Sequence, residues 1–169
     1  MKLKQIAHIA FTCKDLEASV AFYRDVLGCT NKFRIRYGEW LDHLIAEAKK
    51  AGKAPDPAQV ARLTPIADKT WIAYMEMADG QFIELFDAGA ATEFDVPDGT
   101  KLNYNHLSIE TDDIHALYDR LTECGVKTDS EPKLGLEHTW QLWTQDPDGN
   151  RIEFMMYTTR SWQLTGHEN

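Results

Sequence analysis

The 169-residue chain contains an internal repeat. Residues 8–28 read HIAFTCKDLEASVAFYRDVLG, and residues 106–125 read HLSIETDDIHALYDRLTECG. Each segment begins with a histidine in an alternating apolar stretch, has an aspartate seven residues later and ends at a glycine. A second pair follows, since DGQFIELF at 79–86 matches DGNRIEFM at 148–155. Such self-similarity predicts two copies of one structural unit.

Each copy is expected to form one strand, one helix and three more strands. The first stretch of each copy alternates apolar and polar residues, and the next places its apolar residues on one helical face. Asp15 and Asp113 precede the helices as N-caps, and Gly28 and Gly125 follow their C-terminal ends. The expected strands are 6–12, 33–37, 71–77 and 81–86 in the first copy and 105–111, 126–134, 139–144 and 151–157 in the second, with helices at 16–27 and 114–124. The last two strands of each copy are joined at an Asp-Gly turn, Asp79-Gly80 and Asp148-Gly149.

The first copy is longer because it carries an insert. His8 and Glu84 are 76 positions apart, whereas His106 and Glu153 are 47 apart. The 29 extra positions fall in residues 39–69, which have no counterpart in the second copy. Helical apolar spacing, interrupted by glycine and proline, predicts a helical hairpin there. It either packs on the sheet or a partner subunit, or covers the site as a lid.

We therefore expect an α+β fold in which two βαβββ modules form a paired half-barrel. The modules together make one domain over residues 1–158. Its parts are module one at 1–88 with the insert at 39–69, a linker at 89–102 and module two at 103–158, followed by a C-terminal tail at 159–169.

Four residues of ligand type occupy equivalent places in the two modules. His8 and His106 lie on the first strands, and Glu84 and Glu153 lie on the last strands. If each module forms half a barrel, a pseudo-twofold axis brings these four side chains to its centre. Two imidazoles and two carboxylates suit a divalent metal of borderline or hard character. We expect one ion per site, Ni²⁺ or Zn²⁺ first, with Mn²⁺, Co²⁺ or Fe²⁺ also compatible.

These motifs resemble the vicinal oxygen chelate superfamily, which includes glyoxalase I, methylmalonyl-CoA epimerase, extradiol dioxygenases and bleomycin-resistance proteins. QDPDGNRIEFM at 145–155 is typical of the superfamily's final hairpin. The resemblance covers almost the whole chain apart from the insert and the tail. It implies paired βαβββ modules around a metal ion, usually in a homodimer.

The ligand order His-Glu-His-Glu is similar to that of glyoxalase I-like members. Extradiol dioxygenases use two histidines and one carboxylate, and methylmalonyl-CoA epimerases typically carry Gln at the position of Glu84. The resemblance implies a metal-dependent lyase or isomerase, similar to lactoylglutathione lyase, acting through an enediolate on a vicinal hydroxy-carbonyl substrate. Glu153 would be the leading base and Glu84 the second. An epimerase-like or dioxygenase-like enzyme of the same fold, or a small-molecule-binding resistance protein, are the alternatives.

The sequence does not identify the thiol that would form part of such a substrate. Glyoxalase I proteins that use glutathione typically have an arginine shortly after the first histidine, where this chain has Thr12 or its neighbour. Arg34 and Arg36 on the next strand are candidate replacements.

Further candidate substrate contacts lie near the ligands in the sequence. They are His138, Tyr104, Asn105 and Trp140. One or two of the strand aromatics Trp71, Tyr74, Trp140 and Trp143 would face the metal and form an apolar wall.

Composition limits the partners. The net charge of −9, from 27 acidic and 18 basic residues, disfavours nucleic acid. No apolar run approaches the roughly 20 residues of a membrane span. Three scattered cysteines with no CxxC pair predict the reducing cytoplasm. The expected partner is a small-molecule substrate.

Overall fold

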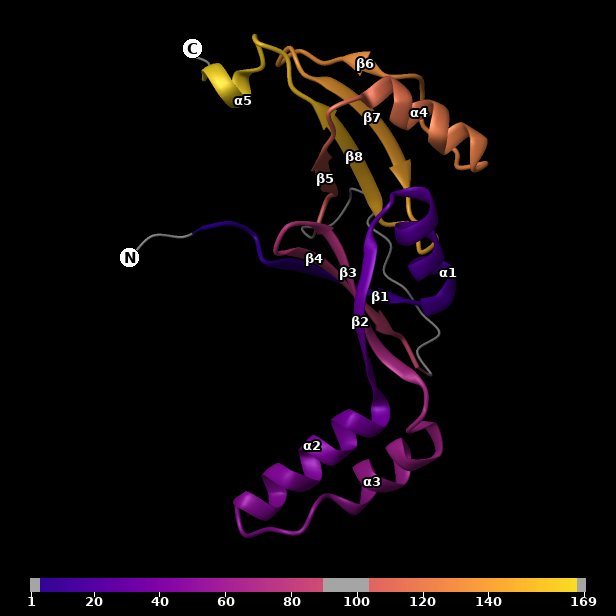
Figure 1. Ribbon diagram of the computed structural model, residues 1–169, viewed down its shortest axis with the longest axis vertical. Coiled ribbons are helices and arrows are strands. Elements are labelled where there is room, and N and C mark those ends of the chain that lie inside the picture. The colour runs from indigo at the N-terminus through magenta and orange to yellow at the C-terminus, as the bar shows by residue number, and fades with distance from the viewer. Residues whose placement is uncertain (1–3, 90–103, 167–169) are drawn as a thin grey trace. The chain divides into compact units, whose positions relative to one another are not determined.

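The computed structural model describes residues 4–89 and 104–166. The chain divides into two compact units, Met1–Thr92 and Glu93–Asn169, and each contains one four-stranded mixed sheet (Figure 1). The two sheets have equivalent strand orders, β1-β4-β3-β2 and β5-β8-β7-β6. The predicted α+β class with two related modules is therefore confirmed.

The first unit contains the strands β1 (His8–Cys13), β2 (Thr30–Arg36), β3 (Thr70–Ala78) and β4 (Gln81–Asp87). β1 runs parallel to β4, and the other pairs are antiparallel. β3 and β4 are joined at the predicted turn, where Gly80 has a φ of 68°. This left-handed conformation costs glycine little because it has no Cβ.

One helical segment covers the sheet of the first unit. α1 (Leu16–Ala21) begins at Asp15, whose carboxylate accepts a hydrogen bond from the Ala18 N–H at 3.0 Å. It continues as a π-helical segment, Phe22–Val26, where the sequence predicted one regular helix. α1 packs against β3 and β4, and the inward-facing Ile83 and Leu85 of β4 are fully buried.

The insert between β2 and β3 forms helices. They are α2 (Tyr37–Lys50), α3 (Pro57–Leu63) and a 3₁₀ turn, Thr64–Ile66. Tyr37, Leu41 and Leu63 form a buried cluster of their own. Because α2 begins at Tyr37, β2 ends one residue earlier than the predicted strand 33–37, and it begins three residues earlier.

The second unit contains the strands β5 (Leu107–Glu110), β6 (Lys133–Leu134), β7 (Trp140–Gln145) and β8 (Arg151–Met156), with the helix α4 (Ile114–Glu123). α4 is capped by the predicted Asp113, whose carboxylate accepts hydrogen bonds from two backbone N–H groups at its start. It packs against β7 and β8. Gly149, in the β7–β8 connection, also has a positive φ, 85°.

The second unit departs from the prediction at its second strand. A strand was expected over 126–134, but only Lys133–Leu134 pairs as a strand, with an isolated bridge from Thr128 to Thr144. Pro132, within this segment, has no N–H to give to a ladder. The predicted tail contains a short helix, α5 (Trp162–Thr165). The predicted linker lies outside the described residues apart from Gly89.

Candidate metal centre

The first unit brings His8 and Glu84 together on one face of its sheet. Ala10 lies opposite Glu84 in the parallel β1–β4 ladder, and His8 precedes Ala10 by two residues. Side chains two apart on a strand point to the same face, so His8 reaches diagonally toward Glu84. His8 Nδ1 lies 3.5 Å from Glu84 Oε1. The histidine side chain is 51% exposed and that of Glu84 only 8%.

The second unit repeats this diagonal arrangement with His106 and Glu153. Ser108 lies opposite Glu153 in the β5–β8 ladder, and His106 again precedes that position by two residues. His106 Nε2 lies 3.3 Å from Glu153 Oε2, and the Glu153 side chain is 7% exposed. The sequence repeat therefore corresponds to one register used twice. Within residues 4–89 and 104–166, no three His, Cys, Asp or Glu side chains group closely enough to hold a metal ion, and each unit brings together two of the four predicted ligands.

Glu84 has a hydroxyl group beside it. Tyr74 lies directly across from Glu84 in the β3–β4 ladder. The hydrogen bond from its hydroxyl to Glu84, followed by burial and by the negative charge of Glu84, raises the pKa of Tyr74 to about 12. Tyr74 therefore stays a neutral donor to this carboxylate. Phe33 stacks on its ring, with centroids 4.2 Å apart.

Glu153 has an indole at the matching position. Trp143 lies directly across from Glu153 in the β7–β8 ladder. Its ring contacts the His106 imidazole edge to face, with centroids 4.8 Å apart. The Arg151 guanidinium lies 4.7 Å from the Trp143 ring centroid and binds Asp129 at 2.9 Å. The two pairs thus share a register but differ in surroundings.

His106 is held by its sequence neighbour. Its Nδ1 lies 2.7 Å from Oδ1 of Asn105. An amide oxygen only accepts, so Nδ1 is the donor in this contact. Metal-ligating imidazoles are usually oriented in this way, by a hydrogen bond from one ring nitrogen to a neighbouring group.

The residues present fit a divalent cation. Glu84 and Glu153 are both buried, and among the described residues the ion-pair partner of each is a histidine, which is charged only when protonated. A buried carboxylate without a cation is costly, and a bound divalent ion would remove this cost. Imidazole nitrogen and carboxylate oxygen are also the donors that such ions prefer.

Two of the other predicted contacts lie away from Glu153. His138 has Nε2 3.5 Å from the Arg160 guanidinium, and its carbonyl accepts from Thr158 and Ser161, so it is held by the C-terminal segment. Trp140 alternates with Trp143 on β7 and contacts His115 of α4, with ring centroids 5.2 Å apart. It therefore lies on the helix-covered face of the sheet.

Tyr104 lies near Asp146 of the β7–β8 connection. Burial, and then the nearby charge of Asp146, raise the pKa of Tyr104 to about 12. Asp146 belongs to the β7–β8 connection, where it accepts hydrogen bonds from the backbone and side chain of Asn150. Of the predicted substrate contacts, Asn105 is the one in direct contact with a predicted ligand.

The sequence reasoning did not single out Phe33, Asp129 or Arg151 for the site. Arg151 precedes Glu153 by two residues on β8, so strand alternation alone places it on the same face. Phe33 and Asp129 had no comparable signal, because their placement depends on the register of neighbouring segments.

Comparison with known proteins identifies the family. The family model of the Glyoxalase/Bleomycin resistance protein/Dioxygenase superfamily matches residues 5–154, and the chain belongs to this superfamily. Members of it usually use a divalent metal ion and act on small molecules. A relative from Vibrio parahaemolyticus, described as a probable lactoylglutathione lyase, is 26% identical, with 96% of this chain and 97% of that protein covered.

Solved structures share the fold. A glyoxylase/bleomycin resistance protein/dioxygenase domain from Frankia has a TM-score of 0.65 at 20% identity, covering 98% of this chain and 96% of that one. A lactoylglutathione lyase from Agrobacterium tumefaciens has a TM-score of 0.58 at 16% identity, covering 92% and 96%. In the part of the chain that the structure describes, no helix has the length and apolar character needed to cross a membrane.

Proposed function

We propose that the chain is a divalent-metal-dependent lyase or isomerase of the glyoxalase I type, acting on a vicinal hydroxy-carbonyl compound. The observation that carries this proposal is the repeated diagonal pair, in which a buried glutamate faces a histidine in each unit. The description of the Vibrio relative as a probable lactoylglutathione lyase supports the same reaction class.

The proposed ligands are His8, Glu84, His106 and Glu153, which together would hold one ion, with Ni²⁺ or Zn²⁺ the first candidates. We further propose a homodimer as the functional state. The two pairs then come either from one chain or from two chains. In the part of the chain that the structure describes, Cys13, Cys29 and Cys124 form no disulfide, which supports the cytoplasm as the compartment.

The metal, when bound, would act as a Lewis acid that lowers the pKa of the substrate C–H and stabilises the enediolate. The chain's own residues would move the proton. We assign the leading base to Glu153, because Trp143 across from it offers no hydroxyl, whereas the Tyr74 hydroxyl donates to Glu84 and would hold that carboxylate in place. Glu153 would take the proton, and Glu153 or Glu84 would return it to the neighbouring carbon.

The surroundings bear on how an anionic substrate would be held. Each candidate arginine has a carboxylate partner, Glu17 for Arg34, Glu39 for Arg36 and Asp129 for Arg151. Arg151 differs in that it lies on the Glu153 face of β8 beside Trp143. We therefore propose Arg151 as the cation that receives a substrate carboxylate, which would replace Asp129 on the guanidinium, in place of the arginine absent near Thr12.

The test is metal analysis combined with a substrate panel. Protein purified without chelators is expected to hold one divalent ion per site and to convert the adduct of methylglyoxal with a thiol. Turnover of a 2-methylacyl thioester would indicate an epimerase instead, and turnover of a catechol a dioxygenase. No stoichiometric metal, together with tight binding of a small molecule and no turnover, would indicate a resistance-type binding protein.

A further inference from the structure

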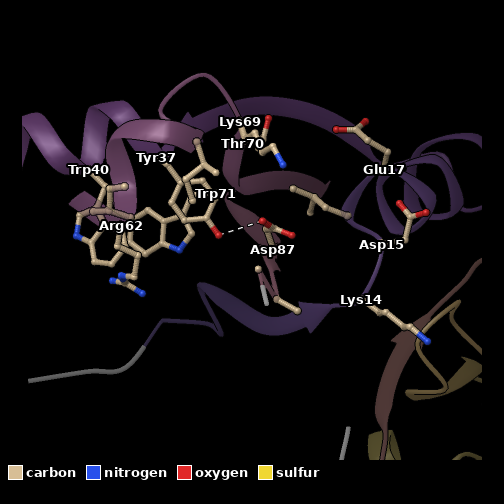
Figure 2. A pocket seen from close by; sticks show the side chains of 15 residues that line it. Lys14, Asp15, Glu17, Tyr37, Trp40, Arg62, Lys69, Thr70, Trp71 and Asp87 are labelled. Atoms are coloured by element: carbon tan, nitrogen blue, oxygen red, sulfur yellow. Dashed lines mark hydrogen bonds between the residues drawn. The ribbon is translucent and has the colours of Figure 1, made fainter. Parts of the chain in front are cut away.

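The first unit contains a large pocket away from the His8–Glu84 pair. Its volume is about 960 Å³, near the upper end of the range for small-molecule sites. The pocket lies between the insert, the start of α1 and the ends of β1 and β4 (Figure 2). Its lining includes Tyr37, Trp40, Arg62, Trp71 and Asp87.

Strand alternation places this pocket on the opposite face of the sheet from Glu84. Glu84 and Asp87 are three residues apart on β4, so their side chains point to opposite faces. Leu85 shares the face of Asp87 and is fully buried on the side where α1 packs. The pocket is therefore separate from the candidate metal centre.

Aromatic side chains form one wall. Trp40 of α2 and Trp71 of β3 stack with ring centroids 4.3 Å apart and planes 15° apart. Tyr37 lies 6.3 Å from Trp71, and its hydroxyl donates to Asp87 at 3.0 Å (Figure 2). Leu63 is buried at the base of this group. The wall is aromatic, and two of its three aromatic residues come from the insert.

The charges around the pocket favour an anion. Its three carboxylates already have partners, since Asp15 caps α1, Glu17 binds Arg34 and Asp87 accepts from Tyr37. By contrast, two cationic side chains that line the pocket, Arg62 and Lys69, make no ion pair among the described residues. The Arg62 guanidinium lies 5.8 Å from the Trp40 ring centroid.

We propose that this pocket binds a planar aromatic carboxylate. The aromatic ring would lie against the wall formed by Trp40 and Trp71, with the carboxylate on the Arg62 guanidinium. Guanidinium groups recognise carboxylates through two parallel hydrogen bonds, and indole surfaces favour contact with other aromatic rings. Lys69 adds positive charge to the rim. The insert thereby acquires a role as the wall of a second ligand site.

The experiment titrates 2-naphthoate into the full-length protein and follows the indole N–H signals by ¹H–¹⁵N NMR. Signals of Trp40 and Trp71 are assigned from the W40F and W71F variants. Binding is expected to shift these two signals. The neutral analogue 2-naphthalenemethanol is expected to bind about tenfold or more weakly, because it lacks the charged acceptor.

Substitutions then locate the anion. Arg62→Gln is expected to weaken 2-naphthoate binding about tenfold or more, and Lys69→Gln about two- to threefold because its charge is screened by solvent. Lys53→Gln, an exposed charge of the same insert outside the pocket, is the matched control and should bind as the parent does. Glu153→Gln should also bind normally, which separates this site from the proposed catalytic function.

Four results would overturn the proposal. Three are shifts confined to other indole signals, equal binding of the neutral analogue, and unchanged affinity in folded Arg62→Gln protein. Loss of 2-naphthoate binding in Lys53→Gln as well would also contradict it, since the effect would then be one of overall charge.

Discussion

Tyr74 lies directly across from Glu84 on the neighbouring antiparallel strand and donates its hydroxyl hydrogen to that carboxylate. The equivalent position across from Glu153 is Trp143, which offers no hydroxyl. The two carboxylates related by the sequence repeat therefore differ in their hydrogen-bond surroundings. This asymmetry gives the two glutamates different expected roles.

Glu153→Gln and Glu84→Gln are expected to differ in their effect on kcat. Loss of the general base costs about 10²- to 10⁴-fold, so Glu153→Gln should lower kcat by that amount. Glu84→Gln keeps an oxygen ligand and should lower kcat less, by about tenfold. Steady-state assays on variants with verified metal content measure this. An equal loss in both variants would contradict the assignment of Glu153 as the leading base.

The relation between sequence and site is clearest in the two ligand pairs. The repeat identified the two histidines and two glutamates as equivalent residues, and the β1–β4 and β5–β8 ladders bring each glutamate onto one face with its histidine. Trp143 and Phe33 depend on register: Trp143 meets Glu153 through the β7–β8 ladder, whereas Phe33 reaches Tyr74 past a shift in the β2–β3 pairing. Such a register shift cannot be recognised from the periodicity of apolar residues in the sequence.

The second strand of the second unit shows another limit. The repeat predicted a strand over 126–134, but only Lys133–Leu134 pairs as one. Backbone pairing there depends on local turns, such as the Ser130 hydroxyl donating to the Glu131 carbonyl, which compete with the ladder. The pocket on the opposite face of the sheet from Glu84 was not predicted from the sequence either, because it forms where the folded insert lies beside the ends of β1 and β4.

Asn105→Ala is expected to weaken metal binding about 10- to 100-fold, the usual effect of removing a group that orients a ligating histidine. Its side-chain oxygen lies 2.7 Å from His106 Nδ1 and fixes the ring hydrogen there. Asn105→Asp retains an acceptor and serves as the matched control. Competition against a chelating dye measures both affinities. If alanine and aspartate variants bind metal equally well, Asn105 has no orienting role.

Mixing two inactive variants distinguishes a site within one chain from a site shared by two chains. Glu84→Ala disables the first unit's pair, and Glu153→Ala disables the second unit's pair. In a homodimer with shared sites, a mixed dimer contains one intact site, so activity should return on mixing and subunit exchange. Sites within single chains would give no recovery, and each variant mixed with itself is the control.

Alkaline pH is expected to destabilise the first unit through Tyr37. Burial, followed by the hydrogen bond to Asp87 and the negative charge of Asp87, raises the pKa of Tyr37 to about 12. The unfolded chain loses this proton near the ordinary tyrosine pKa of about 10, whereas the folded chain still holds it. The stabilisation is therefore fully present below pH of about 10 and is lost as the pH rises toward about 12.

Urea unfolding at pH 8 and at closely spaced values above pH 10 measures this loss. Tyr37→Phe should lower the free energy of unfolding at pH 8 by about 1 kcal/mol, because the hydrogen bond to Asp87 disappears. It should also make the decline above pH 10 shallower than in the parent, since one group with a raised pKa is gone. Tyr118→Phe is the control, because the Tyr118 hydroxyl makes no hydrogen bond among the described residues. An unchanged alkaline decline in Tyr37→Phe would show that the stability lost there comes from other groups.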